Sequence, residues 1–284
     1  MTSSISVIMA ARNEEQFIGE AIDSILSQSH ECFELIIVDD GSTDSTYQIA
    51  EKRAEIDDRI RLIRGGGMGP AAARSLAVDI SRGQYILIMD ADDVVPNDRI
   101  EKLLSLAGNQ PRVMIGSNVK LMDVDKNLVG EIIYPQSNKE IRAGFRRLWN
   151  RSVMMPGTIL ASSDLYRDYP YNNNFKYLED WDFVLRVSED PSVYFANSAE
   201  FLYHYRLKPN SVSMNWKMRN QYNALLIENQ IRRRKGLKQI ESLPLLYQEF
   251  RGHPFTLSRF IFIVAAKFVQ HNIWRFKMKK LLGI

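Results

Sequence analysis

The chain has 284 residues, of which 45% are hydrophobic and one, Cys32, is a cysteine. This composition is typical of a globular protein with one large domain or two smaller ones, and one cysteine excludes an intramolecular disulfide framework and suits a reducing compartment. The N-terminal residues lack a basic segment followed by a long apolar core. The longest apolar run near the C-terminus, FIFIVAA, is much shorter than the roughly 20 residues of a spanning helix, so neither a signal peptide nor a transmembrane helix is predicted.

The net charge of +3 conceals an uneven distribution along the chain. From Asn215 onward there are 14 Lys and Arg against 3 Glu, a difference of +11, whereas the preceding part has 23 basic and 31 acidic residues, a difference of −8. An acidic body with a basic C-terminal segment favours an anionic partner for that segment, although a solvated lysine-rich surface is the alternative.

Strand and helix patterns alternate through the N-terminal half. Apolar runs predict strands at 4–11, 33–40, 59–65 and 85–90, and helical spacing predicts helices at 15–28, 42–54, 71–83 and 97–108. Ser42 is the expected cap of the second helix, and Gly83 and Gly108 are expected to close the third and fourth. This alternation predicts an α/β fold with a mostly parallel sheet and helices on both faces.

Polar residues follow the strands at the edge where open α/β sheets bind ligands. Carboxylates gather at two strand ends, and Arg12, Asn13 and Glu14 follow the first strand; the carboxylates are Asp39, Asp40, Asp90, Asp92 and Asp93. Five carboxylates need a positive partner, and a hard cation such as Mg²⁺ or Mn²⁺ suits oxygen ligands. No HExxH or CxxC motif indicates zinc.

The glycine-rich stretch RGGGMGPAAARS, 64–75, supplies flexible backbone and Arg74 near the same edge. It is not a Walker A loop, because no Gly-Lys-Ser/Thr follows. Whether it binds phosphate or is only a turn stays open at this point.

Five stretches in order resemble the motifs of family 2 glycosyltransferases with the GT-A fold: SVIMAARNEE, ELIIVDDGSTDST, GPAAARSLAVDISRGQYILIMDADD, YLEDWDFVLR and YRLKPNSVS. The resemblance covers residues 4–214. It implies a nucleotide-sugar-binding half at 1–115 and an acceptor-binding half at 116–214. Residues 215–284 match nothing, and we expect a basic, amphipathic helical extension there.

The resemblance also implies roles for individual residues in an inverting, metal-dependent transfer. The base of a UDP-type donor would contact Arg12 and Asp39, Asp90 would hold the ribose, and Asp92 would bind Mn²⁺ or Mg²⁺. Asp180 would be the general base, with Glu179 and Asp182 as its nearest competitors. The remaining residues expected to contact the nucleotide sugar are Ala11, Glu14, Asp40, Gly69, Arg74, Ala91 and Lys208.

Three departures from the family pattern stand out. Ala10 and Arg12 stand where many members have Pro and Tyr, and Ser75 replaces an Asn. Lys208 stands where many members carry His. A charged lysine can neutralise a departing phosphate but cannot ligate a metal.

Other classes of function also fit parts of the pattern. A catalytically impaired nucleotide-sugar-binding module and a nucleotidyltransferase remain alternatives, and a dehalogenase-like phosphatase fits poorly because three other strand–helix units precede the DxD motif. The family favours bacterial surface polysaccharide synthesis on a glycan or lipid-linked acceptor, in the cytoplasm or at the inner face of the cell membrane. Residues 255–284 would contact an anionic membrane, or pack on protein, including a second copy of the chain. No nucleic-acid partner is expected.

Overall fold

The computed structural model describes residues 4–147, 153–208 and 216–252. Its centre is an eight-stranded sheet in the order β3-β2-β1-β4-β7-β5-β6, with β8 paired to β5. The strands are β1 Ile5–Ala11, β2 Phe33–Asp39, β3 Ile60–Arg64, β4 Tyr85–Asp90, β5 Val113–Met122, β6 Leu128–Ile132, β7 Leu160–Ser162 and β8 Tyr194–Arg206. Strands β1 to β4 are parallel to one another, and β8 is parallel to β5. Strand β7 is antiparallel to both β4 and β5, and β6 is antiparallel to β5.

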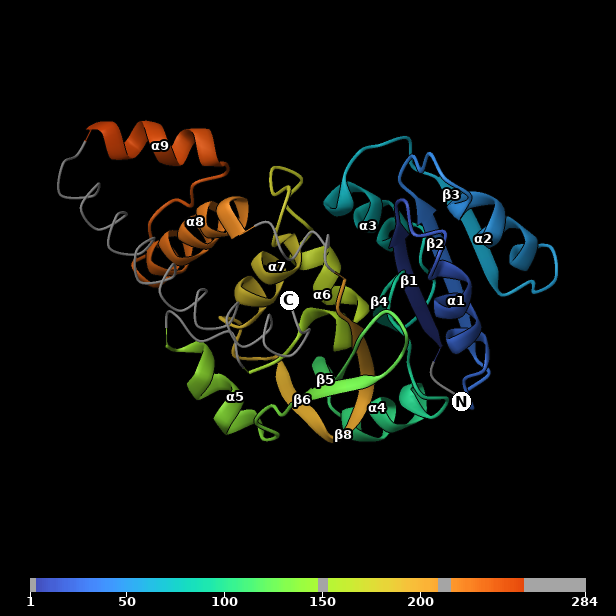
Figure 1. The fold of residues 1–284 in the computed structure, drawn as a ribbon. Coiled ribbons are helices and arrows are strands. Elements are labelled where there is room, and N and C mark those ends of the chain that lie inside the picture. Colours follow the sequence, from blue (N-terminus) through green and yellow to red (C-terminus); the bar gives the residue numbers. More distant parts are fainter. Residues whose placement is uncertain (1–3, 148–152, 209–215, 253–284) are drawn as a thin grey trace.

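Helices cover both faces of this sheet (Figure 1). They are α1 Ile18–Leu26, α2 Thr46–Ala54, α3 Pro70–Asp79, α4 Arg99–Ala107, α5 Asn138–Phe145, α6 Ser163–Asp168, α7 Glu179–Val187, α8 Trp216–Arg234 and α9 Leu243–Gly252. Along β2, Leu35 and Ile37 join the core beneath α1, α2 and α4, whereas Ile36 and Val38 join the core that includes α3 and α7. Because side chains alternate along a strand, a continuous apolar run buries both faces, as the sequence predicts.

The first four predicted strands are confirmed to within one residue at each end, whereas two helix-terminus predictions are wrong. Ser42 does not cap a helix: its Oγ accepts the Asn13 N–H, and α2 begins only at Thr46. Gly83 lies four residues beyond the last residue of α3, at a place where a Cβ would lie 2.4 Å from the Ser6 nitrogen. Close backbone approach therefore explains this glycine, while Gly108, with φ 54°, follows α4 as predicted.

The predicted helical extension begins with α8 and α9, which lie on the opposite side of the molecule from α1 and α2 (Figure 1). Arginines at the end of α8 pack it onto α5: Arg234 donates to the carbonyls of Phe145 and Arg146. The predicted membrane contact at 255–284 lies outside the described residues. Within the described part, none of the helices combines the length and apolarity needed to cross a bilayer.

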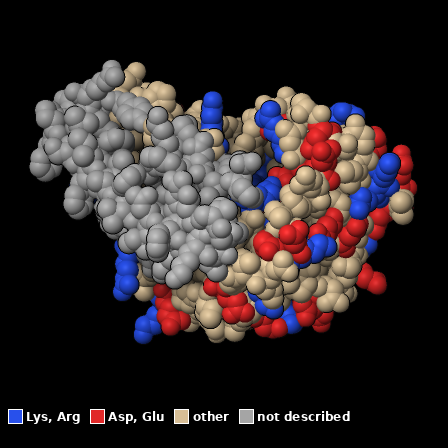
Figure 2. Space-filling model, viewed as in Figure 1, with Lys and Arg blue, Asp and Glu red and all other residues tan. Residues whose placement is uncertain are grey.

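The predicted division at residue 115 falls inside β5, and one sheet runs through both predicted halves. On the face in Figure 2, acidic and basic side chains of the described residues are interspersed, with no continuous basic area. The division into a nucleotide-sugar-binding half and an acceptor-binding half therefore stays a prediction. The candidate site lies at one edge of the shared sheet.

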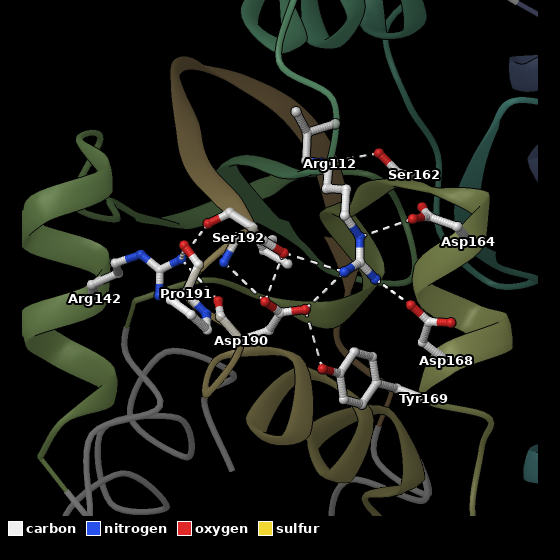
Figure 3. Close-up of polar contacts among 11 residues, drawn as sticks. Arg112, Arg142, Ser162, Asp164, Asp168, Tyr169, Asp190, Pro191 and Ser192 are labelled. Atoms are coloured by element: carbon white, nitrogen blue, oxygen red, sulfur yellow. Dashed lines mark hydrogen bonds and ion pairs between the residues drawn. The ribbon is translucent and has the colours of Figure 1, made fainter.

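One arginine joins three parts of the second half (Figure 3). Arg112, just before β5, forms ion pairs with Asp164 and Asp168 of α6 and with Asp190 after α7, at 2.8 Å for Asp164 and 2.9 Å for Asp190. Its burial acts against the charge, but these carboxylates raise the pKa of Arg112. The guanidinium thus lies among three acids and offsets part of their mutual repulsion.

We expect Arg112→Ala to lower the free energy of unfolding by about 2 kcal/mol, because hydrogen bonds to charged groups contribute on that order. Denaturant unfolding would measure the loss. The matched control is Lys238→Ala, since Lys238 is 89% exposed and its ion pair with Glu241 is 3.9 Å long. Equal stability of the two variants would contradict a structural role for the Arg112 network.

Candidate active site

The loops that follow β1 and β2 are fixed against each other. Asn13 has a left-handed backbone, φ 56°, and donates its N–H to Ser42 Oγ at 3.0 Å. The Asp40 N–H donates to the Ala11 carbonyl at 2.8 Å, so Ala11 is buried at the junction. Arg12 is exposed at the edge of the sheet. These contacts hold the backbone on either side of Arg12 in one conformation.

The two carboxylates at the end of β2, Asp39 and Asp40, have different hydrogen-bond partners. Asp40 accepts the N–H groups of Met68 at 2.6 Å and Gly69 at 2.8 Å, so it shapes the glycine-rich loop. Asp39 accepts the Ser42 N–H through Oδ2 at 3.2 Å. Its Oδ1 is buried and has no hydrogen-bond partner among the described residues. Buried carboxylate oxygens usually have a hydrogen-bond partner, so the predicted contact of Asp39 with a ligand N–H stays a prediction.

The DxD carboxylates follow β4, and their backbone is held from β8. Arg206, 1% exposed, donates its Nε to the Asp92 carbonyl at 2.8 Å and its N–H to Asp93 at 2.7 Å. Burial, with the neighbouring carboxylates of Asp92 and Asp90, raises the pKa of Asp93 well above its usual range. Ala91 is buried between them. Asp93 is therefore a positioning residue, and Asp90 and Asp92 face the cavity.

The positive partner of these carboxylates comes from the chain itself. The Nζ of Lys208 lies 2.6 Å from Asp92 Oδ2 and 2.6 and 2.7 Å from the two carboxylate oxygens of Glu14. Burial alone would lower the pKa of Lys208, but Asp92 and Glu14 outweigh it and raise that pKa. Lys208 therefore stays charged and links the loop after β1 to the loop after β4.

A second cation links β4 to α7. Arg74 of α3 lies 3.0 Å from Asp90 Oδ1 and also forms an ion pair with Glu179. Its burial acts against the charge, but Glu179 and Asp90 raise the pKa of Arg74. Burial in turn raises the pKa of Glu179 to about 7, against the opposing effect of Arg74. Arg74 lines the cavity, and its predicted contact with a diphosphate stays a prediction.

The start of α7 presents the third group of acids. Leu178, at its N-cap, has a left-handed backbone with φ 62°, which costs a residue with a side chain about 1–2 kcal/mol. Strain of this kind is common where a turn must present a functional group. Asp180 lines the cavity, whereas Asp182 is 2% exposed and accepts Arg186 Nε at 2.8 Å. Of the three acids, Asp182 is therefore occupied away from the cavity.

These groups enclose one cavity of about 740 Å³, within the range of small-molecule sites. Eight of the predicted residues line it: Arg12, Glu14, Arg74, Asp90, Ala91, Asp92, Asp180 and Lys208. Four do not: Ala11, Asp39, Asp40 and Gly69, which lie in the strand ends and loop beside it. The cavity is also lined by Met155, Pro156 and the stretch 176–181.

Sequence reasoning missed the buried residues that position the site. Tyr203 OH lies 3.4 Å from Asp90 Oδ2, and Arg99, fully buried, donates to the Gly157 carbonyl at 2.9 Å. Burial lowers the pKa of Arg99 to about 10, which leaves it charged at neutral pH. Arg206 belongs with them. No pattern in a single sequence marks an arginine as buried, so only the structure identifies these three.

The donor set fits a divalent cation that shares its ligands with a substrate. Seven acidic side chains and four basic ones line the cavity, a formal charge of −3, which favours a cation. Within the described residues, no group of three or more His, Cys, Asp or Glu side chains is arranged as a complete metal site. A hard ion held by one or two carboxylates plus phosphate oxygens needs no such group. Asp92 suits that part, although Lys208 contacts it.

Comparison with solved structures identifies the fold. Staphylococcus aureus TarS in complex with UDP superposes with a TM-score of 0.58, at 21% identity over 81% of this chain and 65% of that one. The mannosyltransferase PcManGT of Pyrobaculum calidifontis, in complex with GDP-Man and Mn²⁺, gives a TM-score of 0.62, at 17% identity over 94% and 75%. The fold is therefore that of the GT-A glycosyltransferases, as predicted.

Comparison of sequences gives the family. The model for glycosyl transferase family 2 matches residues 6–169. EpsH of Bacillus subtilis is 28% identical over 74% of this chain, which spans 63% of the length of EpsH. The Escherichia coli protein named UDP-Glc:alpha-D-GlcNAc-diphosphoundecaprenol beta-1,3-glucosyltransferase WfgD is 26% identical over 81% of this chain and 88% of its own. The chain belongs to glycosyltransferase family 2, which confirms the resemblance found in its motifs.

Proposed function

We propose that this protein transfers a sugar from a nucleotide-diphosphate sugar to a hydroxyl group of a glycan or lipid-linked acceptor, with inversion at the anomeric carbon. The observation that supports this proposal is that the DxD carboxylates Asp90 and Asp92 line the same cavity as Asp180. A donor held at the DxD carboxylates would have its anomeric carbon in the same cavity as that base.

The open oxygen of Asp39 supports a uracil base. Its Oδ1 is one buried acceptor, and uracil presents one ring N–H, at N3, to match it. Arg12, exposed at the same edge, can stack its planar guanidinium on the ring. Among the similar solved structures TarS holds UDP and PcManGT holds GDP-Man, and guanine also has a ring N–H, so the choice of UDP is a proposal that the panel of nucleotide sugars tests.

The chemistry assigned to the chain uses two groups. Asp180 accepts the proton of the acceptor hydroxyl as its oxygen attacks the anomeric carbon, and the bond to the diphosphate oxygen breaks on the opposite side. Lys208 lies where it can stabilise the charge that develops on the departing diphosphate. Mn²⁺ or Mg²⁺ at Asp92, when bound, would supply further positive charge to that leaving group.

The biological setting follows the named relatives. WfgD is named for an undecaprenol-linked acceptor, which supports a lipid-linked acceptor and bacterial surface polysaccharide synthesis here. Such an acceptor is presented at a membrane, so we propose work at the inner face of the cell membrane. The membrane contact predicted for residues 255–284 concerns residues that lie outside the described part of the chain.

The test is a panel of nucleotide sugars with Mn²⁺, with release of the free nucleoside diphosphate as the readout. We expect hydrolysis of a UDP-sugar to UDP and free sugar, and faster release once an acceptor is added. Release of pyrophosphate from an NTP would instead indicate a nucleotidyltransferase. Tight binding of a donor with no turnover on any acceptor offered would favour the impaired binding module, and binding of GDP-sugars alone would overturn the choice of UDP.

A further inference from the structure

The ion-pair cluster formed by Glu14, Lys208 and Asp92 carries an inference about how metal and nucleotide enter the candidate site. We infer that Lys208 is the resident counter-ion of Asp92 and Glu14, and that it excludes a free divalent cation from Asp92 until a diphosphate draws its ammonium group away. This inference rests on the proposed function and deepens it, because it assigns an order in which ligands enter the same site.

The distances show that the ammonium group already occupies the position beside the DxD carboxylate. Lys208 Nζ lies 2.6 Å from Asp92 Oδ2, and both oxygens of Glu14 lie within 2.7 Å of the same nitrogen. The side chain of Lys208 is 16% exposed, and those of Glu14 and Asp92 are 20% and 21% exposed. A cation arriving at this Asp92 oxygen would therefore meet a like charge at close range, largely out of water.

The other carboxylates of the DxD stretch, Asp90 and Asp93, already contact neighbouring side chains or are buried. Asp90 is engaged by Arg74 through Oδ1 and contacts Tyr203 OH through Oδ2. Asp93 is fully buried and does not line the cavity. A divalent cation without nucleotide would thus have to share Asp92 with the ammonium group of Lys208, which makes binding of the bare ion at this carboxylate weak.

A bound diphosphate changes this balance. Its oxygens give the ammonium group of Lys208 an alternative anionic partner, and they also supply the remaining oxygen ligands that a hard ion needs. Lys208 keeps a strong ion pair if it moves from Asp92 to the phosphate, and the move frees the Asp92 oxygen. Ion and nucleotide should therefore bind with positive coupling, each raising the affinity of the other by the same factor.

The test measures Mn²⁺ binding to the nucleotide-free protein, by electron paramagnetic resonance of the free ion. We expect weak binding to the wild type and binding at least about 10-fold tighter to Lys208→Met, because the repulsion between a divalent ion and one like charge about 4 Å away exceeds a factor of ten even at the dielectric constant of water. Lys208→Arg keeps the charge and should stay weak. Lys102→Met is the matched control, since Lys102 pairs with Asp98 and Glu200 outside the cavity.

A second readout uses UDP. With Mn²⁺ present, Lys208→Met should bind UDP less tightly than the wild type while it binds bare Mn²⁺ more tightly, and a purely structural lysine would not produce these opposite changes. Mn²⁺ affinity in Lys208→Met that equals or falls below the wild-type value would overturn the inference, while leaving the proposed function in place.

If the variant does not fold, thermal unfolding of the wild type provides the test. Mn²⁺ should raise the melting temperature only together with UDP, and a comparable rise with Mn²⁺ alone would overturn the inference. Absence of UDP binding under every condition would count against the proposed function itself and against the inference that rests on it.

Discussion

Asp180→Asn should reduce sugar transfer by about 10²–10⁴-fold, which is the usual loss when a general base is removed. The expected affinity for UDP stays within a few-fold of the wild type, because the base acts on the acceptor hydroxyl and not on the nucleotide. Single-turnover transfer from a UDP-sugar measures the rate, and calorimetric titration of UDP measures the affinity.

The informative comparison is Asp182→Asn, two residues further along α7. Asp182 is 2% exposed and paired with Arg186 at 2.8 Å, so its substitution should lower stability while the rate of the folded enzyme is retained. The assignment of Asp180 as the general base is wrong if Asp180→Asn transfers sugar at a near-normal rate while Asp182→Asn, although folded, does not.

Arg74→Leu should lower the free energy of unfolding by about 3–5 kcal/mol, because removing one partner of a buried ion pair leaves an uncompensated charge. The Arg74 side chain is 14% exposed and lies between Asp90 and Glu179, whose side chain is 6% exposed. Chemical denaturation followed by circular dichroism measures this loss. Arg61→Leu is the control: Arg61 pairs with the single carboxylate of Glu34 and is 31% exposed, so its loss should be smaller.

A double variant separates the bridge from simple packing. If Arg74 holds α7 through Glu179, Arg74→Leu/Glu179→Gln should recover part of the stability lost in Arg74→Leu, since the carboxylate no longer remains buried without its partner. Strictly additive losses in the double variant, or equal losses for Arg74→Leu and Arg61→Leu, would show that the ion pair between Arg74 and Glu179 does not hold α3 and α7 together.

Local pattern determined much of the fold. Runs such as FELIIVD bury alternate side chains on the two faces of one sheet, and a continuous apolar run of this length already predicts such a strand from local sequence. The same logic placed Asp39, Asp90 and Asp92 at one edge, because parallel strands end on the same side. Helix ends were predicted less well: Ser42 and Gly83 serve contacts with Asn13 and Ser6 that come from distant parts of the chain.

The roles of individual site residues divide in the same way. The sequence by itself determined which residue types surround the site, since its motifs name Asp92, Asp180 and Lys208. Only the tertiary structure decided their partners: Lys208 meets Glu14 across a separation of 194 residues, and Arg74 meets Glu179 across 105. The physical reason is that ion pairing depends on distance in space and on burial, and both are fixed by how β8 and α7 pack against the sheet, which local periodicity does not encode.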